Sequence, residues 1–139
     1  MRSSRLFVLL PLLLALAGCE NSGVSYQIDG DKEHSISLLR EQNVPWGKVE
    51  QSLVPARAPD CQRRVQIDPD KREFTEMKLY VNDTRLYVAN QGKNWWAVGT
   101  QSCQVQKFKT PPVDPGDLIG SFKKKGDALV FEPVPEAAQ

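Results

Sequence analysis

The sequence predicts a mainly β fold, either a small antiparallel sandwich or a partly open barrel, and two observations predict it. Apolar and polar residues alternate with a period of two through most of the chain after residue 33, as in strands that are buried on one face. Turn-forming pairs separate these runs at short intervals, among them Asn82-Asp83, Gln91-Gly92 and Gly126-Asp127. Short strands at this spacing are typical of sandwiches and barrels.

The predicted strands follow one another along the body. The first covers His34 to Arg40, where Ile36 and Leu38 lie on one face and serines lie on the other. The later strands are indicated by alternating apolar residues, namely Met77, Leu79 and Val81, then Leu86 and Val88, then Cys103, Val105 and Phe108, and finally a run that ends in Leu129, Val130 and Phe131.

One segment of the body suits a helix as well as a strand. Trp46, Val49 and Leu53 are spaced by three or four residues, Pro45 suits the start of a helix, and Pro55 would end it. We therefore expect either one short helix or an irregular strand in this segment.

A hairpin around Gln91-Gly92 places two aromatic residues side by side. With these two residues as the loop, Tyr87 lies opposite Trp96, and Arg85 lies beside them. Because Trp, Tyr and Arg dominate interface hot spots, we expect Arg85, Tyr87 and Trp96 to form a binding surface if this face is open. The alternative is that segment 110–115 or Trp46 covers it. The opposite face, which we expect to be core, carries Leu86, Val88, Trp95 and Ala97.

The first 18 residues have the three parts of an export signal. Arg2 and Arg5 supply positive charge, Leu6 to Ala17 is almost wholly apolar, and Gly18 follows as a second small residue. A helix needs roughly 20 apolar residues to span a bilayer, and this run is shorter. We therefore expect residues 1–18 to be a signal peptide that is removed.

The residues Leu16-Ala17-Gly18-Cys19 resemble the lipobox of bacterial lipoproteins. The resemblance implies cleavage before Cys19 and acylation of its thiol and of its new amine. Each buried methylene contributes about 0.8 kcal/mol, so several acyl chains hold a protein firmly on a membrane. Because Glu20 follows, rather than the aspartate associated with inner-membrane retention, the expected location is the outer membrane, with the body facing the periplasm.

This interpretation divides the chain into four parts. We expect a signal peptide at 1–18, the lipidated cysteine and a tether at 19–32, the β domain at 33–132 and a loose tail at 133–139. Because Val24, Tyr26 and Ile28 are spaced two apart, the tether could end in a strand. Without residues 1–18, the chain holds 16 basic and 17 acidic residues in one domain of modest size. Because no basic excess exists to neutralise a phosphate backbone, nucleic acid is not an expected partner.

The two cysteines of the body, Cys61 and Cys103, form an even pair in an oxidising compartment, and we expect a disulfide between them. In the simple chain-entropy model, closing a loop of this length contributes about 4 kcal/mol. The sequence contains no Cys-x-x-Cys motif that would indicate redox chemistry.

Few residues indicate chemistry. His34 is the only histidine, and the aspartates lie in turn sequences, so we expect no catalytic residue, no metal site and no cofactor. The adjacent residues Arg63 and Arg64 are candidates for contact with an anion, because a guanidinium offers a rigid fork of donors. On a strand they would point in opposite directions, so at most one of them faces any single ligand.

The segments His34-Ser35-Ile36, Pro59 to Arg64 and Trp95 to Cys103 resemble a group of small uncharacterised proteobacterial lipoproteins. This resemblance supports the envelope location and the paired cysteines, and it implies no activity. We therefore expect a binding or accessory module, not an enzyme, that contacts another envelope component, with an envelope protein as its partner. The alternatives are a binder of a small molecule or glycan and, less favoured, a hydrolase.

Overall fold

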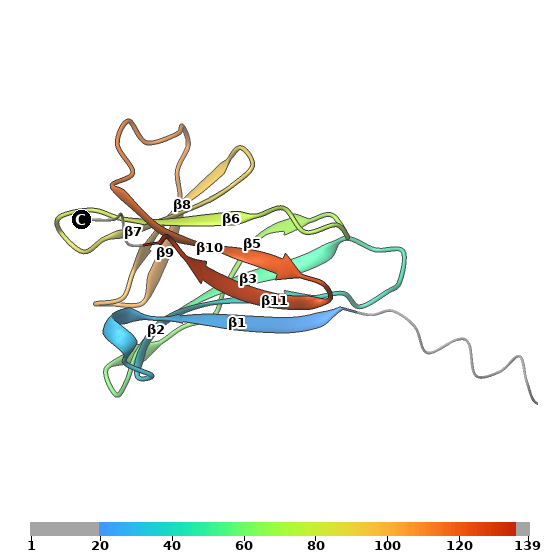
Figure 1. Ribbon diagram of the computed structural model, residues 1–139, viewed down its shortest axis with the longest axis horizontal. Helices are drawn as coiled ribbons and strands as arrows, with labels where there is room; N and C mark the ends of the chain where they lie inside the picture. Colours follow the sequence, from blue (N-terminus) through green and yellow to red (C-terminus); the bar gives the residue numbers. More distant parts are fainter. Residues whose placement is uncertain (1–19, 136–139) are drawn as a thin grey trace, which may run out of the picture.

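The computed structural model describes residues 20–135, which form a sandwich of two antiparallel sheets (Figure 1). The predicted small antiparallel β sandwich is confirmed, and the two sheets do not close into a barrel. The part of the chain that the structure describes contains no α-helix and one short 3-10 turn.

Sheet 1 has five strands in the order β1-β2-β3-β4, and β5 also pairs with β3. The 3-10 turn, Ile28–Gly30, connects β1 to β2 and buries Ile28. The strands are β1 (Asn21–Gln27), β2 (His34–Glu41), β3 (Val49–Arg57), β4 (Cys61–Gln62) and β5 (Val65–Asp70).

Sheet 2 has six strands in the order β11-β10-β6-β7-β8-β9. Tight turns connect most neighbours along the chain, and Gly126-Asp127 turns between the last two strands, as expected from the sequence. The strands are β6 (Met77–Val81), β7 (Tyr87–Gln91), β8 (Asn94–Gly99), β9 (Gln104–Lys107), β10 (Asp117–Lys125) and β11 (Ala128–Pro133).

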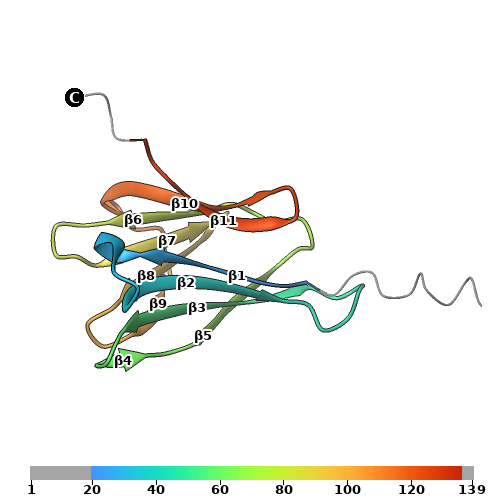
Figure 2. The same ribbon diagram turned by 60° about the horizontal axis from the view of Figure 1, so that its bottom comes forward.

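The core lies between the two layers, which Figure 2 shows one above the other. Alternate residues of each strand point inward, as expected for sheets that pack face to face. The most completely buried side chains are Ile36, Leu38 and Leu53 from sheet 1, and Met77, Leu79, Trp96 and Phe122 from sheet 2.

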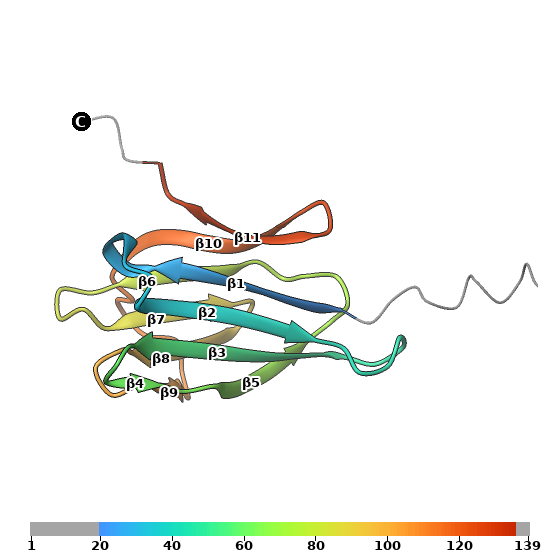
Figure 3. The ribbon, with the colours of Figure 1, turned by 90° about the horizontal axis from the view of Figure 1, so that it is seen from below.

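The sandwich is closed along one side and open along the other (Figure 3). On the closed side β1 packs against β11, and the Tyr26 and Phe131 ring centroids are 4.7 Å apart. On the open side β5 and β9 are outer strands that do not pair with each other. The Cys61–Cys103 disulfide and an ion pair between Lys107 and Asp68, of 2.8 Å, connect the two sheets there.

The segment expected to be a tether is part of the fold instead. β1 pairs along its whole length with β2, from Asn21 opposite Glu41 to Gln27 opposite Ser35. Val24 and Tyr26 pack against the core, while the polar residues between them face solvent. The β domain therefore begins near residue 20 rather than at 33. Cys19 and the expected signal peptide lie outside the described residues, as do residues 136–139 of the expected tail.

The segment for which we expected either a short helix or an irregular strand forms β3, and its register against β5 shifts between Val49 and Gln51. The strand alternative is therefore confirmed, and the helix does not form. Val49 and Leu53, four residues apart, both point inward on a strand, with Gln51 between them. A spacing of four residues fits both a helix and a strand. Because the inward residue between them, Gln51, is polar, the alternation typical of a strand was not evident in the sequence. Trp46 lies in the loop before β3.

Candidate functional site

Arg85, Tyr87 and Trp96 do not form the predicted binding surface, because two of the three side chains are buried. Tyr87 and Trp96 share one face, as expected, but that face is the core: their exposed fractions are 3% and 2%. Sheet 1 covers them, rather than segment 110–115. Arg85 alone is on the surface, where its guanidinium pairs with Asp29 at 3.1 Å.

The hairpin differs from the prediction in its register as well. Its loop is Gly92-Lys93, with Gly92 at a φ of +58°, so Gln91 pairs with Asn94 and Tyr87 lies opposite Val98. Both faces of the hairpin carry similar numbers of apolar residues, so its own pattern could not decide which face is buried. The aromatic pair on the outer face is Tyr80 and Trp95, with centroids 5.9 Å apart.

A groove runs between β5 and β9 on the open side of the sandwich. One part of it is a hollow of about 320 Å³. It is lined by apolar residues, Val65, Ile67, Val105 and the core residue Trp96, and by the polar residues Gln66, Asp68 and Lys107. A second hollow of about 230 Å³ is lined by Val65, Val105 and Arg63. We call these two hollows together the β5/β9 groove.

The backbone of β9 is unpaired along the side that faces away from β8. The Phe108 N–H donates to the Trp95 carbonyl at 2.9 Å, in register with the β8–β9 ladder. Because backbone groups alternate in direction along an antiparallel strand, the N–H and C=O groups of Val105 and Lys107 point outward. No strand among residues 20–135 pairs with this edge. Such an edge is a template for pairing with another chain.

Of the two predicted anion contacts, only Arg63 lies at the β5/β9 groove. Its guanidinium is exposed, and it makes no hydrogen bond or ion pair with any residue between 20 and 135. Arg64 points to the outer face of sheet 1, where it pairs with Glu41 at 3.0 Å and donates to the Ser52 hydroxyl at 3.2 Å. The two arginines therefore point in different directions, as the sequence suggested, and Arg64 already has an anionic partner.

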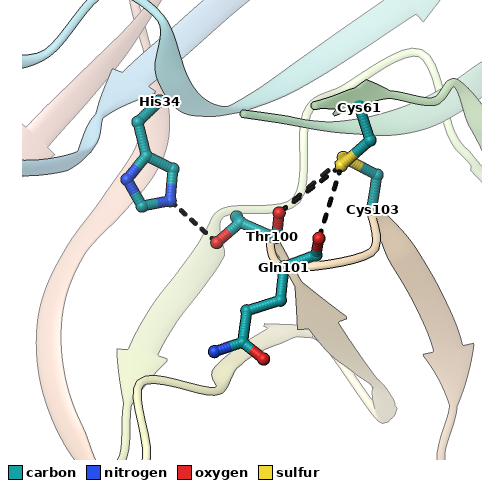
Figure 4. The surroundings of a disulfide bond; sticks show 5 residues. All are labelled: His34, Cys61, Thr100, Gln101 and Cys103. Atoms are coloured by element: carbon teal, nitrogen blue, oxygen red, sulfur yellow. Dashed lines mark hydrogen bonds between the residues drawn. A yellow bond between two sulfur atoms is a disulfide. The ribbon is translucent and has the colours of Figure 1, made fainter. Parts of the chain in front are cut away.

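The predicted Cys61–Cys103 disulfide is present at one end of the groove (Figure 4). The Cys61 sulfur lies 3.5 Å from the Thr100 carbonyl oxygen; because a disulfide sulfur carries no proton, this is a contact rather than a hydrogen bond. His34 Nε2 lies 2.7 Å from the Thr100 hydroxyl, which connects β2 to the turn after β8. Thr100 is buried, so this pair joins the two sheets beside the disulfide.

A buried polar network lies near the opposite end of the strands, and sequence reasoning missed it. The Arg40 side chain is fully buried between the sheets. Its guanidinium donates to Glu20 at 3.0 Å, to Asp70 at 2.9 Å and to Gln51 at 2.9 Å, and it lies 4.6 Å from the Phe74 ring centroid. The sequence did contain one indication that Arg40 is buried. Ile36, Leu38 and Arg40 are alternate residues of one predicted strand, so all three lie on its inward face.

The network continues across the sandwich to sheet 2. Gln51 donates to the Gln91 side chain at 2.8 Å, and the Thr75 N–H and hydroxyl both donate to Asp70 at 2.9 Å. Burial by itself would raise the pKa of Glu20, but hydrogen bonds from Arg40 and Lys124 outweigh it and lower that pKa to about 2. Glu20 is therefore a charged and fixed part of the body.

The described residues contain no group of His, Cys, Asp and Glu side chains that could hold a metal ion. Between residues 20 and 135, no helix is long and apolar enough to cross a membrane. Comparisons with protein-family models, with curated proteins and with solved structures found no match. The resemblance to proteobacterial lipoproteins therefore stays a prediction.

Proposed function

We propose that the protein is a lipid-anchored binding module of the cell envelope, whose β5/β9 groove holds an extended segment of a partner protein. The observation that carries this proposal is the asymmetry of the sandwich. One side is closed by packing between β1 and β11, and the other presents an unpaired strand edge beside the β5/β9 groove, whose lining is partly apolar.

The edge of β9 favours a partner in extended conformation. An added strand would pair its backbone with the outward groups of Val105 and Lys107, which is how many domains bind peptides by extending a sheet. β9 has four residues, so it offers only a few main-chain hydrogen bonds. Affinity and selectivity must therefore come also from side chains in the β5/β9 groove.

The groove's lining indicates which side chains the partner carries. Val65, Ile67 and Val105 would bury apolar side chains, which lie on one face of an extended segment at every second residue. The Arg63 guanidinium, which has no anionic partner among the described residues, suits a carboxylate of the same segment. The ligand class is therefore an extended peptide with alternating apolar residues and an acidic residue near Arg63.

The same geometry favours a peptide over a glycan. Sugar rings stack on exposed aromatic faces, and the aromatic residues expected to provide them, Tyr87 and Trp96, are buried. The two hollows of the groove are at or below the lower end of the volumes of pockets that enclose small ligands, roughly 300 to 1,000 Å³. An elongated and shallow site matches a strand better than a compact molecule.

Anchoring is the second part of the proposal. The lipobox-like residues before Cys19 support acylation at that position, and tethering near other envelope proteins raises the effective concentration of the module for them. Intact-mass measurement of the protein extracted from membranes tests this part. An added mass of acyl chains on Cys19 is expected, and a chain without them would contradict it.

Site-specific photo-crosslinking in intact bacterial cells tests the binding part. A photoreactive residue at position Gln106, on the rim of the groove, is expected to form an adduct with an envelope protein. The matched control is Ser25, which is exposed on β1 at the closed side of the sandwich. Mass spectrometry of the adduct is expected to map the linkage to an extended segment with an acidic residue. Equal adducts from both positions, or none from Gln106, would contradict the proposal.

A further inference from the structure

We propose that the end of the sandwich that carries Glu20 rests on the bilayer, with Trp46 inserted among the lipid headgroups. This inference rests on the proposed acylation of Cys19 and adds to it a second, non-covalent contact with the same membrane. Its occupant is the bilayer that holds the acyl chains, not a further protein.

The first step is the position of Glu20. Its carbonyl accepts a hydrogen bond of 2.7 Å from the Gln42 N–H, and its carboxylate is held by Arg40 at 3.0 Å and by Lys124 at 2.8 Å. Consecutive Cα atoms are about 3.8 Å apart, and Cys19 directly precedes this fixed residue in the sequence. Acyl chains on Cys19 would therefore bring this end of the body to the membrane surface without a spacer.

The second step is the loop of residues 42–48, which begins beside Glu20. In Figures 1 and 3 this β2–β3 loop projects from the same end of the molecule as the start of β1 and the β10–β11 turn. At its tip Trp46 is 85% exposed, and Val44 is 40% exposed. Trp46, the most exposed aromatic side chain of the described residues, thus lies four residues after Gln42, whose backbone N–H is hydrogen-bonded to Glu20.

The third step is that this loop is held in place. The buried Gln42 side chain donates to the carbonyls of Gly47 at 2.8 Å and of Pro45 at 3.3 Å, and the Gly47 N–H donates to the Val44 carbonyl at 3.1 Å. A Cβ added at Gly47 would meet the Val44 Cγ2 atom at 2.6 Å, so a larger residue there would displace the Val44 side chain. The backbone therefore presents Trp46 outward, and insertion would require little further ordering.

The chemistry of this end suits a headgroup region. Trp is enriched at membrane interfaces, where its apolar ring and polar N–H are both accommodated. Lys48 in the same loop is exposed, and Lys125 at the β10–β11 turn is exposed and pairs with Glu132 at 3.1 Å. Lysines close to a surface of anionic lipid are attracted to it. The same contact would fix how the body is oriented above the membrane.

Quenching of tryptophan fluorescence by brominated lipids tests this inference on the full mature protein. The acylated protein is reconstituted into vesicles of phosphatidylethanolamine and phosphatidylglycerol, with and without bromine on the acyl chains near the carbonyls. We expect the bromolipids to quench the wild-type protein and Trp46→Phe to lose most of that quenching. The matched control Trp95→Phe, which changes a ring on the outer face of sheet 2, is expected to keep it.

Intact-mass measurement of the same sample separates the two proposals. If acyl chains are present and Trp46→Phe is quenched as strongly as the wild type, the inference is overturned while the anchoring stands. Absence of quenching in the acylated wild type would also overturn the inference. The loop of residues 42–48 would then be a candidate contact for a protein partner instead. If no acyl chain is present on Cys19, the anchoring proposal itself fails, and this inference fails with it.

Discussion

At the scale of single residues, a buried arginine connects the start of the described chain to the interior. Arg40 is surrounded by Glu20, Asp70 and Gln51, and every buried side-chain polar atom among residues 20–135 has a hydrogen-bond partner. A buried charge is costly unless it is paired in this way. The network therefore favours one arrangement of the two sheets near the Glu20 end.

Removal of the arginine is expected to be strongly destabilising. Arg40→Ala would leave Asp70 buried without its cation and Glu20 with only Lys124, so we expect a loss of about 3–5 kcal/mol in the free energy of unfolding. Urea-induced unfolding measures it. Arg64→Ala is the control, because that ion pair is about half exposed and its loss should cost less than about 1 kcal/mol. Equal losses in the two variants would contradict the role given to Arg40.

The lowered pKa of Glu20 predicts a dependence of stability on pH. Because the pKa falls from an ordinary value of 4.5 to about 2 on folding, its contribution is complete above pH 4.5 and is lost as the pH falls towards 2. In urea unfolding between pH 2 and 5, Glu20→Gln should therefore show a weaker loss of stability than the wild type. An unchanged slope in the variant would contradict the pairing of Glu20.

At the scale of elements, period-two patterns predicted the strands whose inward residues are all apolar. β6 is an example, because Met77 and Leu79 point inward and Lys78 outward, as expected. Polar residues made two other strands harder to predict. The inward Gln51 left β3 open between a helix and an irregular strand, and the many polar, outward residues of β1 made it resemble a tether.

The β7–β8 hairpin shows why a local pattern does not locate a site. Val88 is buried on the outer face, beneath the Tyr80/Trp95 pair, so burial does not alternate along β7. Sheet 1 packs on one face of the hairpin, and this packing makes that face the core. The sequence of the hairpin alone does not show on which face sheet 1 packs. Of the candidate site, the sequence indicated Arg63 and the disulfide. The β5/β9 groove arises from strands that only the topology brings together.

In the structure Trp96 is in the core and Trp95 is on the outer face, the reverse of the prediction. Substitutions of these two adjacent residues should therefore differ in their effect on stability. Trp96→Ala empties a site between the sheets and should lower the free energy of unfolding by about 3–5 kcal/mol. Trp95→Ala removes a partly exposed ring from the outer face and should cost distinctly less. Denaturant unfolding of the two variants compares them, and a larger loss for Trp95→Ala would contradict the assignment of faces.

At the scale of the whole molecule, the three regions of interest lie at separate places. The Glu20 end carries the proposed membrane contact, and the disulfide joins the sheets near the other end of the strands. The eight residues of β2 span about 23 Å at 3.3 Å per residue, so these ends lie at about that separation. The β5/β9 groove runs along one side between them. A partner strand could therefore approach the groove from the periplasm while the body stays on the membrane.

The central claim is that the β5/β9 groove binds a partner, and the adjacent arginines test it most directly. Arg63 lies on the groove and Arg64 faces the other side of sheet 1, so Arg63→Ala and Arg64→Ala remove the same charge from neighbouring positions. The measurement is the yield of the partner adduct formed through position Gln106 in intact cells. We predict a clear loss with Arg63→Ala and wild-type yield with Arg64→Ala. Equal yields from the two variants would contradict the account.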